Sequence, residues 1–334
     1  MKNKDFQYYL SAFFTDYLPK HKGASSNTIS SYRDCFALFL EYCDKATDIN
    51  IDELSFQNIN TSLILNFLCW LENSRKVSPQ TRNNRLAAIK SFCKFVELEA
   101  PEFYEKCSLI RKIEPKKCEK KSINYLSVEA VKILMEQPDT RTKQGLRDLA
   151  LIALMYDSAA RVQELATLTV SKIILNNTNI VYLTGKGNKT RIVPISKEVA
   201  GILKRYINTY ELKNDDLLFF NKSHKQLTKE GISYILDKYI SKSKEKYFEI
   251  FNKKITPHCI RHSKAMHILD ANVNLIYIRD FLGHVSVKTT EIYCTANPET
   301  RRKQIETASN GIIKNTKYSA EEKSSLQNFL KELI

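Results

Sequence analysis

Residues 255–293 read ITPHCIRHSKAMHILDANVNLIYIRDFLGHVSVKTTEIY, and the interpretation of the rest of the chain starts from this stretch. It holds four of the six histidines of the protein. Apolar residues at helical spacing predict two helices, separated by a break at residues 270–274. Gly283 is expected to end the second helix as its C-cap, which places His284 just beyond the helix.

The side chains of this stretch are suited to chemistry on a phosphate. Arg261 follows His258 by three residues, about one helical turn, and a guanidinium offers a planar fork of donors to phosphate oxygens. Imidazoles exchange protons near neutral pH, and a tyrosine hydroxyl can act as a covalent nucleophile. The tyrosine in question is Tyr293, nine residues after His284.

Two boxes and a tyrosine in this order resemble the catalytic end of the tyrosine recombinases, the phage integrase family that includes the Xer recombinases and Cre. HCIRH, residues 258–262, is similar to the H-x-x-R-H box of that family, and FLGH resembles its L-G-H box. Tyr293, in TTEIY, occupies the place of the nucleophile that becomes joined to DNA. Further upstream, the A-R-x-x-E-L pattern around Arg161 and Glu164 resembles the first arginine box.

The resemblance implies how the phosphate is handled. Arg161 and Arg261 would hold the scissile phosphate and stabilise its developing charge. Tyr293 would attack it to give a 3′-phosphotyrosine, and Glu164 would support this group of residues. One phosphodiester is exchanged for an ester of similar energy, so no ATP, no other cofactor and no metal is expected.

Further roles follow from the same resemblance. His258 would take or share the tyrosine proton, and His284 would hold a phosphate oxygen. A β-hairpin is predicted over residues 179–195, because two alternating segments flank the turn GKGNK, which is rich in residues that tolerate positive φ. Lys186, in that turn, resembles the catalytic lysine that protonates the departing 5′ oxygen.

The composition predicts a nucleic-acid partner rather than a membrane. The net charge is +15 and the sequence pI is about 9.3. Residues 1–111 carry 14 Lys and Arg against 13 Asp and Glu, whereas residues 112–310 carry 34 against 21. The basic excess therefore lies with the histidine-rich region. A generic basic surface is the other interpretation of the charge alone.

The cysteines and the apolar segments predict a cytoplasmic, nucleoid-associated protein. Eight cysteines are scattered singly without a C-x-x-C pair, which is typical of reduced core residues. No apolar run reaches transmembrane length, and the N-terminus resembles no signal peptide.

The expected fold is mainly α with a small antiparallel β-hairpin or sheet, in two domains that form a DNA clamp. Residues 1–110 are predicted to be a helical core-binding, SAM-like domain, and residues 111–123 a basic linker. Residues 124–310 are predicted to be the mixed α+β catalytic domain, and residues 311–334 a tail. The helices of the first domain are expected over residues 6–18, 27–43, 61–71 and 78–98.

Several polar residues are expected to contact the DNA. The helix over residues 78–98 has one apolar face, and its opposite face carries amides and lysines that fit a DNA groove. The basic linker can follow a phosphate backbone. Ordinary solvated surfaces are the alternative for both. The residues expected to bind DNA are Asn83, Lys90, Lys94, Lys116, Lys117, Lys189 and Arg191.

A last helix over residues 319–334 has an apolar stripe that needs a groove. The stripe consists of Leu326, Phe329, Leu330 and Leu333. The resemblance implies that this helix docks onto a neighbouring protomer, and the stripe's own domain is the alternative partner. The expected partners are double-stranded DNA with an inverted-repeat core site and further copies of the chain, a dimer per site and a tetramer in the synapse.

The expected function is site-specific DNA recombination that integrates and excises a mobile element, and several other functions compete with it. An Xer-type chromosome or plasmid dimer resolvase and a type IB topoisomerase use the same chemistry. A metal hydrolase is a further alternative, because His258 and His262 are four residues apart, although H-E-x-x-H is absent. A DNA-binding factor without cleavage would lack one of the expected groups, and none is missing from the sequence.

Overall fold

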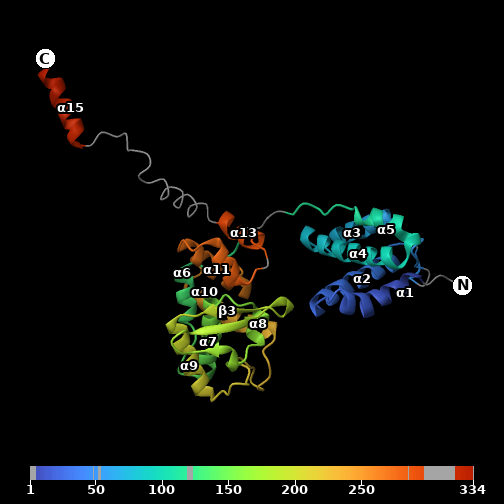
Figure 1. Ribbon diagram of the computed structural model, residues 1–334, viewed down its shortest axis with the longest axis horizontal. Helices are drawn as coiled ribbons and strands as arrows, with labels where there is room; N and C mark the ends of the chain where they lie inside the picture. Colours follow the sequence, from blue (N-terminus) through green and yellow to red (C-terminus); the bar gives the residue numbers. More distant parts are fainter. Residues whose placement is uncertain are drawn as a thin grey trace. The chain divides into compact units, whose positions relative to one another are not determined.

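A computed structural model describes residues 5–47, 49–51, 54–118, 123–284, 286–296 and 320–333. The chain divides into two units, Met1–Lys120 and Lys121–Ile334, each with its own hydrophobic core (Figure 1). The first unit is helical, and the second combines helices with one small antiparallel sheet. The predicted fold class is therefore confirmed.

The first unit packs its helices around an aromatic core. Phe13, Phe36 and Phe92 stack edge to face within it, with ring centroids 5.1–6.4 Å apart. Edge-to-face contacts suit the quadrupoles of aromatic rings. The elements are α1 (Asp5–Ala12), the π-helix η1 (Phe13–His21), α2 (Ser26–Ala46), α3 (Thr61–Asn73), α4 (Pro79–Glu99), the 3₁₀-helix η3 (Pro101–Phe103) and α5 (Tyr104–Arg111).

Local signals placed some of these helix ends correctly and others wrongly. Ser78 caps α4 and Pro79 is its first residue, as predicted. The first helix does not end at Pro19, because it continues as a π-helix that contains this proline. The N-cap of α3 is Asn60 rather than Thr61, since the Asn60 side chain accepts the hydrogen bond of the Leu63 amide. The short helix α5 has few buried residues and was not predicted.

Along the chain, the second unit begins with helices, continues with the three strands of the sheet and ends with further helices. Ser127 and Ser196 cap two of its helices, because the side chain of each accepts a hydrogen bond from a backbone amide of the first turn. The elements are α6 (Val128–Met135), α7 (Lys143–Asp157), α8 (Val162–Ala166), η4 (Val170–Lys172), β1 (Ile173–Ile174), β2 (Ile180–Thr184), η5 (Lys186–Asn188), β3 (Thr190–Pro194), α9 (Lys197–Tyr210), α10 (Lys229–Lys246), α11 (Pro257–Asp270), α12 (Leu275–Leu282), α13 (Lys288–Ala296) and α15 (Ala320–Glu332).

The predicted hairpin is present, and a third strand joins it. The strand order is β1-β2-β3, all antiparallel, and Leu183 lies opposite Arg191. Val181 and Leu183 are buried, as the alternation predicts. The hairpin turns at Gly187, whose φ of +74° favours glycine. Strand β1 has only two residues, too few to show an alternating pattern.

The helix that carries Tyr293 packs on a small apolar cluster of its own. This cluster joins α11, α12 and α13 to the end of α7, and Ala159 lies at the bend that follows α7. Its fully or nearly fully buried members are Ala159, Ala265, Met266, Leu269, Ile278, Leu282 and Tyr293. The cluster therefore fixes the three helices of residues 257–296 against one another.

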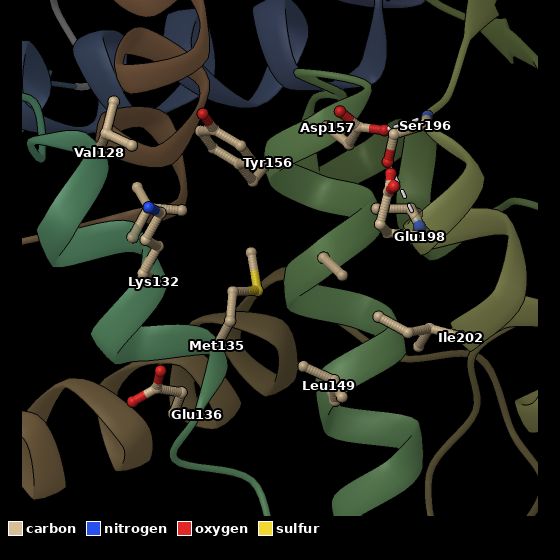
Figure 2. Close-up of a pocket in the computed structure, with 13 residues that line it drawn as sticks. Val128, Lys132, Met135, Glu136, Leu149, Tyr156, Asp157, Ser196, Glu198 and Ile202 are labelled. Atoms are coloured by element: carbon tan, nitrogen blue, oxygen red, sulfur yellow. Dashed lines mark hydrogen bonds between the residues drawn. The ribbon is translucent and has the colours of Figure 1, made fainter.

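A cavity of about 510 Å³ opens on another side of the same unit (Figure 2). Apolar side chains from α6, α7 and α9 line it, among them Met135, Leu149 and Ile202. Charged residues, among them Lys132 on α6 and Glu198 on α9, also line it (Figure 2). Among the described residues, no helix is both long enough and apolar enough to cross a membrane.

Candidate active site

Helix α11 carries three polar side chains of the site. Thr256 caps it and Pro257 is its first residue, so the HCIRH box lies within its first two turns. Arg261 is 2% exposed and donates to the Ala159 carbonyl oxygen at 2.6 Å and to the Leu282 carbonyl oxygen at 2.5 Å. Burial, and then the charges of Arg161 and Arg191, lower its pKa to about 10, so it remains a cation at neutral pH.

Ala159 turns the chain at the end of α7 so that its carbonyl oxygen faces Arg261. Its φ of +47° lies in the left-handed region, where a residue with a Cβ is strained by about 1–2 kcal/mol. Ala159 is fully buried, so the surrounding packing holds this conformation. Arg161 then follows at the N-cap position of α8.

Arg161 is the more accessible of the two predicted phosphate-binding arginines. Its side chain is 37% exposed, and it donates to Glu164 at 2.9 Å and to the Gly283 carbonyl oxygen at 3.2 Å. The Glu164 carboxylate also accepts the backbone N–H of Arg161 at 2.8 Å. Glu164 thus orients Arg161 through both its side chain and its backbone.

Arg191, on β3, lies inside the site and pairs with Glu164. Its guanidinium donates to both carboxylate oxygens of Glu164, at 2.7 and 2.8 Å, and to the Phe281 carbonyl oxygen at 3.0 Å. Its side chain is only 11% exposed. All three guanidinium nitrogens of Arg191 therefore donate within the protein, and its predicted contact with a DNA phosphate stays a prediction.

Tyr293 lies in the site but is almost completely covered, with 1% of its surface exposed. Its hydroxyl is 2.9 Å from Nδ1 of His262. Burial raises the pKa of Tyr293, although the charges of Arg261 and Arg161 oppose this shift. Burial, then His258 and Arg261, lower the pKa of His262 to about 4, so its imidazole is neutral at pH 7.

The hydroxyl partner of Tyr293 is therefore His262, whereas the sequence interpretation assigned the tyrosine proton to His258. The two imidazole rings lie edge to face with centroids 4.4 Å apart. Burial, followed by the charges of Arg261 and Arg161, lowers the pKa of His258. The helical spacing of α11 could have revealed His262, which is one residue beyond Arg261 in the H-x-x-R-H box.

His284 lies just after α12, as predicted from the glycine that precedes it. Gly283 ends the helix with φ +63°, and Nδ1 of His284 is 2.9 Å from the hydroxyl of Thr290 on α13. Burial, then the charges of Arg261 and two further arginines, lower the pKa of His284 to about 4. A neutral imidazole in this place can donate a hydrogen bond to an anion.

The hairpin carries Lys186 and Lys189, and the structure describes the side chain of Lys189 alone of these two. The backbone of Lys186 lies in η5 at the hairpin turn, and its side chain lies outside the described part of the chain. Lys189 is exposed, and its carbonyl oxygen accepts the Gly185 N–H at 2.9 Å. The roles of both ammonium groups remain predictions.

In the first unit, one residue that is predicted to bind DNA makes hydrogen bonds within the protein. Asn83 exchanges two hydrogen bonds with the backbone of Lys116, at 2.7 and 2.9 Å, so its amide holds the start of the linker. The Lys116 ammonium pairs with Glu72 at 2.8 Å. The predicted DNA contacts of Asn83 and Lys116 stay predictions. Lys94 and Lys117 are exposed and Lys90 is partly exposed.

The described residues offer no arrangement of three or more His, Cys, Asp or Glu side chains that could hold a metal ion. The His258 and His262 pair that motivated the hydrolase alternative has Tyr293 as its neighbour instead of a third ligand. The site is thus a cluster of arginines, neutral imidazoles and one tyrosine, which is the chemistry expected for attack on a phosphodiester.

Comparison with known proteins gives the same result over nearly the whole chain. Residues 124–300 match the Phage integrase family, and residues 12–100 match the phage integrase N-terminal SAM-like domain. The putative integrase/recombinase y4rC of Sinorhizobium fredii is 31% identical over 287 residues, covering 86% of each chain. The tyrosine recombinase XerD of Staphylococcus epidermidis is 32% identical over 295 residues, covering 87% of this chain and 95% of that protein.

Solved structures share the fold. The Tn1549 transposon integrase in complex with transposon right end DNA has a TM-score of 0.68 with 16% identity, covering 91% of this chain and 98% of that chain. XerH bound to a palindromic difH substrate has a TM-score of 0.67 with 22% identity, covering 90% of this chain and 84% of that chain. The chain therefore belongs to the phage integrase family of tyrosine recombinases, enzymes that break and rejoin DNA at specific sites.

Proposed function

We propose that this recombinase integrates and excises a mobile element through a 3′-phosphotyrosine formed by Tyr293. One observation carries the proposal: the Tyr293 hydroxyl is hydrogen-bonded to a neutral imidazole, within the field of Arg161 and Arg261. A tyrosine near a proton acceptor and two cations is suited to attack on a phosphate.

The proposed reaction forms one bond to phosphorus and breaks another. The Tyr293 oxygen attacks the scissile phosphate while Arg161 and Arg261 stabilise the charge that develops on its oxygens. The 5′ oxygen leaves and takes a proton from Lys186. The attack of that hydroxyl, or of the hydroxyl of a second strand, reverses these steps. His284 holds a phosphate oxygen, and Glu164 keeps Arg161 in place.

We assign the tyrosine proton to His262 instead of His258. The support is the 2.9 Å contact between Nδ1 of His262 and the hydroxyl. The lowered pKa of His262 leaves its ring neutral at pH 7, so Nδ1 is available as an acceptor in one tautomer. His258 is then assigned to the phosphate beside Arg261.

The biological role is proposed from two kinds of relative. The similarity to a putative integrase/recombinase and to a transposon integrase favours a mobile element. The similarity to XerD over 95% of its length favours the second candidate, an Xer-type chromosome or plasmid dimer resolvase. A type IB topoisomerase would share the chemistry without a specific site.

The proposed partners are double-stranded DNA with an inverted-repeat core and other copies of the chain. Two protomers would occupy one site and four would form the synapse, in the cytoplasm at the nucleoid. Helix α15 is proposed to dock onto a neighbouring protomer. Its apolar stripe supports this, because Leu326, Phe329, Leu330 and Leu333 are 49–65% exposed. The proposed N-cap, Ser319, lies outside the described residues.

Sequencing the DNA that becomes covalently joined to the protein tests the proposed role. Expression in cells, denaturation and recovery of adducts should yield one core sequence at both ends of the element that carries the gene. Recovery of a single chromosomal or plasmid resolution site would instead support the resolvase. Adducts spread over unrelated sequences, together with relaxation of any supercoiled plasmid, would support the topoisomerase.

A further inference from the structure

Three consecutive carbonyl oxygens at the end of α12 each accept a hydrogen bond from a different arginine. Arg191 donates to Phe281 at 3.0 Å, Arg261 donates to Leu282 at 2.5 Å and Arg161 donates to Gly283 at 3.2 Å. The last carbonyls of a helix lack partners within it and carry its negative dipole end, so they attract cations. The FLGH segment therefore brings three arginines together.

Arg191 differs from the other two arginines in its contacts. Its remaining donors go to both oxygens of Glu164, at 2.7 and 2.8 Å, in a two-pronged pair that fixes the carboxylate plane. The same two oxygens of Glu164 also accept hydrogen bonds from the side chain and the backbone N–H of Arg161. Arg191 thus reaches Arg161 through a single shared carboxylate.

Two glycines leave the space that this arrangement needs. A Cβ on Gly283 would lie 2.9 Å from Cδ of Arg191, and a Cβ on Gly185 would lie 2.9 Å from Oε1 of Glu164. Such distances are shorter than real carbon contacts. Gly283 also has a φ of +63°, which favours glycine independently. The backbone on both sides is therefore built closely around Arg191 and Glu164.

The ion pair with Arg191 also keeps Glu164 ionised. The carboxylate is 4% exposed, and burial alone would raise its pKa. The hydrogen bonds and charge of Arg191, and then the contacts with Arg161, outweigh burial and hold the pKa at about 2. Without Arg191, Arg161 would be the remaining arginine hydrogen-bonded to this buried carboxylate among the described residues.

We propose that Arg191 is a positioning residue of the recombination reaction: through Glu164 and the Phe281 carbonyl it sets the guanidinium of Arg161 and the end of α12 where the phosphate binds. The assignment rests on the proposed function, in which Arg161 holds that phosphate. Arg191 itself does not contact DNA, because its three nitrogens are already engaged inside the protein.

Arg191→Met, Arg191→Lys and Glu164→Gln test the assignment, with Arg205→Met as the matched control. Arg205 lies on α9 and donates only to the Thr140 carbonyl oxygen among the contacts described. The substrate is a nicked duplex whose sequence is taken from DNA trapped covalently by the wild-type protein. Covalent cleavage is timed in single turnover, and binding is measured at several salt concentrations.

A positioning role predicts a large loss of rate with binding unchanged. Arg191→Met should slow cleavage about 100-fold, since a displacement of about 1 Å in a reacting group has this effect. Arg191→Lys should recover only part of the lost cleavage rate, because an ammonium cannot donate to both carboxylate oxygens in the geometry of a guanidinium. Adding Glu164→Gln to Arg191→Met should cause little further loss, because both act through one contact. Arg205→Met should cleave at the wild-type rate.

Two further readouts separate positioning from simple support of the fold or contact with DNA. In Arg191→Met the acid limb of the cleavage profile should move to higher pH, since the pKa of Glu164 loses its main lowering influence. The slope of log affinity against log salt should stay constant, whereas loss of one phosphate contact would reduce it by about 1. An unchanged acid limb, wild-type cleavage or a reduced slope would each overturn the proposal.

Failure of the proposed function gives a different result. A wild-type protein that traps no DNA would refute the proposed function without deciding the role of Arg191. The crystal structure of Arg191→Met then decides it. The proposal predicts that the guanidinium of Arg161 leaves the Gly283 carbonyl oxygen, and retention of that hydrogen bond would overturn it.

Discussion

At the scale of single residues, the site separates the groups that meet the phosphate from those that hold them. Arg161 is partly exposed and Arg261 is fully buried, yet each donates to a carbonyl at the end of α12. Tyr293 is buried, and its hydroxyl is hydrogen-bonded to His262. Reaction with DNA therefore requires the tyrosine hydroxyl to become accessible to the phosphate.

His262→Asn tests the proton assignment, since an amide oxygen keeps the hydrogen bond but accepts no proton at neutral pH. We expect cleavage to slow by about 10²–10⁴-fold, the usual range for general acid–base help. A substrate with sulfur in place of the leaving 5′ oxygen should not restore the cleavage rate of His262→Asn. It should restore the cleavage rate of Lys186→Ala, because a thiolate leaves without a proton from a general acid. Single-turnover rates with both substrates give the answer. A larger loss in His258→Asn than in His262→Asn would contradict the assignment.

At the scale of elements, the sequence predicted those whose signals are local. The Ser78-Pro79 start of α4, the hairpin with its glycine turn and the Gly283 end of α12 follow from the chemistry of a few neighbouring residues. The position of Arg191 depends on Glu164, which is 27 residues away in the sequence, and on the Phe281 carbonyl. No local pattern shows that contact, so the sequence predicts only that Arg191 binds a DNA phosphate.

Asn83 shows the same limit. Its place on the polar face of α4 was predicted correctly, but its partner is the backbone of Lys116, 33 residues later. An amide on an exposed helix face fits a base edge and a neighbouring chain segment equally well. Periodicity identifies the face that a residue occupies, and only the tertiary fold identifies the partner.

Gly283→Ala tests the close packing at the end of α12. A Cβ there meets Arg191 at 2.9 Å and also requires a left-handed backbone. We expect the free energy of unfolding to fall by about 1–2 kcal/mol. Urea unfolding measures this change.

The matched control is Gly201→Ala on α9, where nothing lies within 4 Å of the added methyl group. This change should stabilise the protein by about 0.5–1 kcal/mol, because alanine favours the helix interior. Equal effects of the two substitutions would show that the contact with Arg191 and the backbone conformation are unimportant.

At the scale of the whole molecule, buried titratable groups make stability depend on pH. The pKa values of His262 and His284 are about 4 in the folded state, against about 6.5 in an unfolded chain. Between these values the unfolded chain binds more protons, so the free energy of unfolding falls as the pH drops from about 6.5 to about 4. Glu164 acts in the same direction at lower pH, because its pKa is lowered to about 2.

The melting temperature should therefore be lower at pH 4.5 than at pH 7.5. His262→Asn should reduce this difference, because it removes one of the imidazoles whose pKa is lowered in the folded state. His224→Asn is the control: this histidine is exposed, and asparagine tolerates its φ of +55°. Thermal melts across the pH range measure the effect. A melting temperature that is independent of pH in the wild type would contradict the lowered pKa values.

Removing residues 319–334 tests the proposed docking of α15. Binding of one protomer to a half-site should be unchanged. Cooperative binding of a second protomer should weaken, because the deletion removes the apolar stripe that is proposed to dock onto the neighbouring protomer. Gel-shift titration on a two-half-site duplex measures both. Leu330→Asp should resemble the deletion, and Gln327→Asp should resemble the wild type. Full cooperativity in the deletion would show that α15 does not join protomers.

The central claim is that Tyr293 becomes joined to DNA. The most direct measurement is covalent capture of a nicked core duplex by the wild-type protein and by Tyr293→Phe, resolved after denaturation, with mass spectrometry of the joined peptide. We predict an adduct on Tyr293 in the wild type, and no adduct but unchanged site binding in Tyr293→Phe, since only the nucleophilic oxygen is removed. A denaturation-resistant adduct formed by Tyr293→Phe would contradict the account.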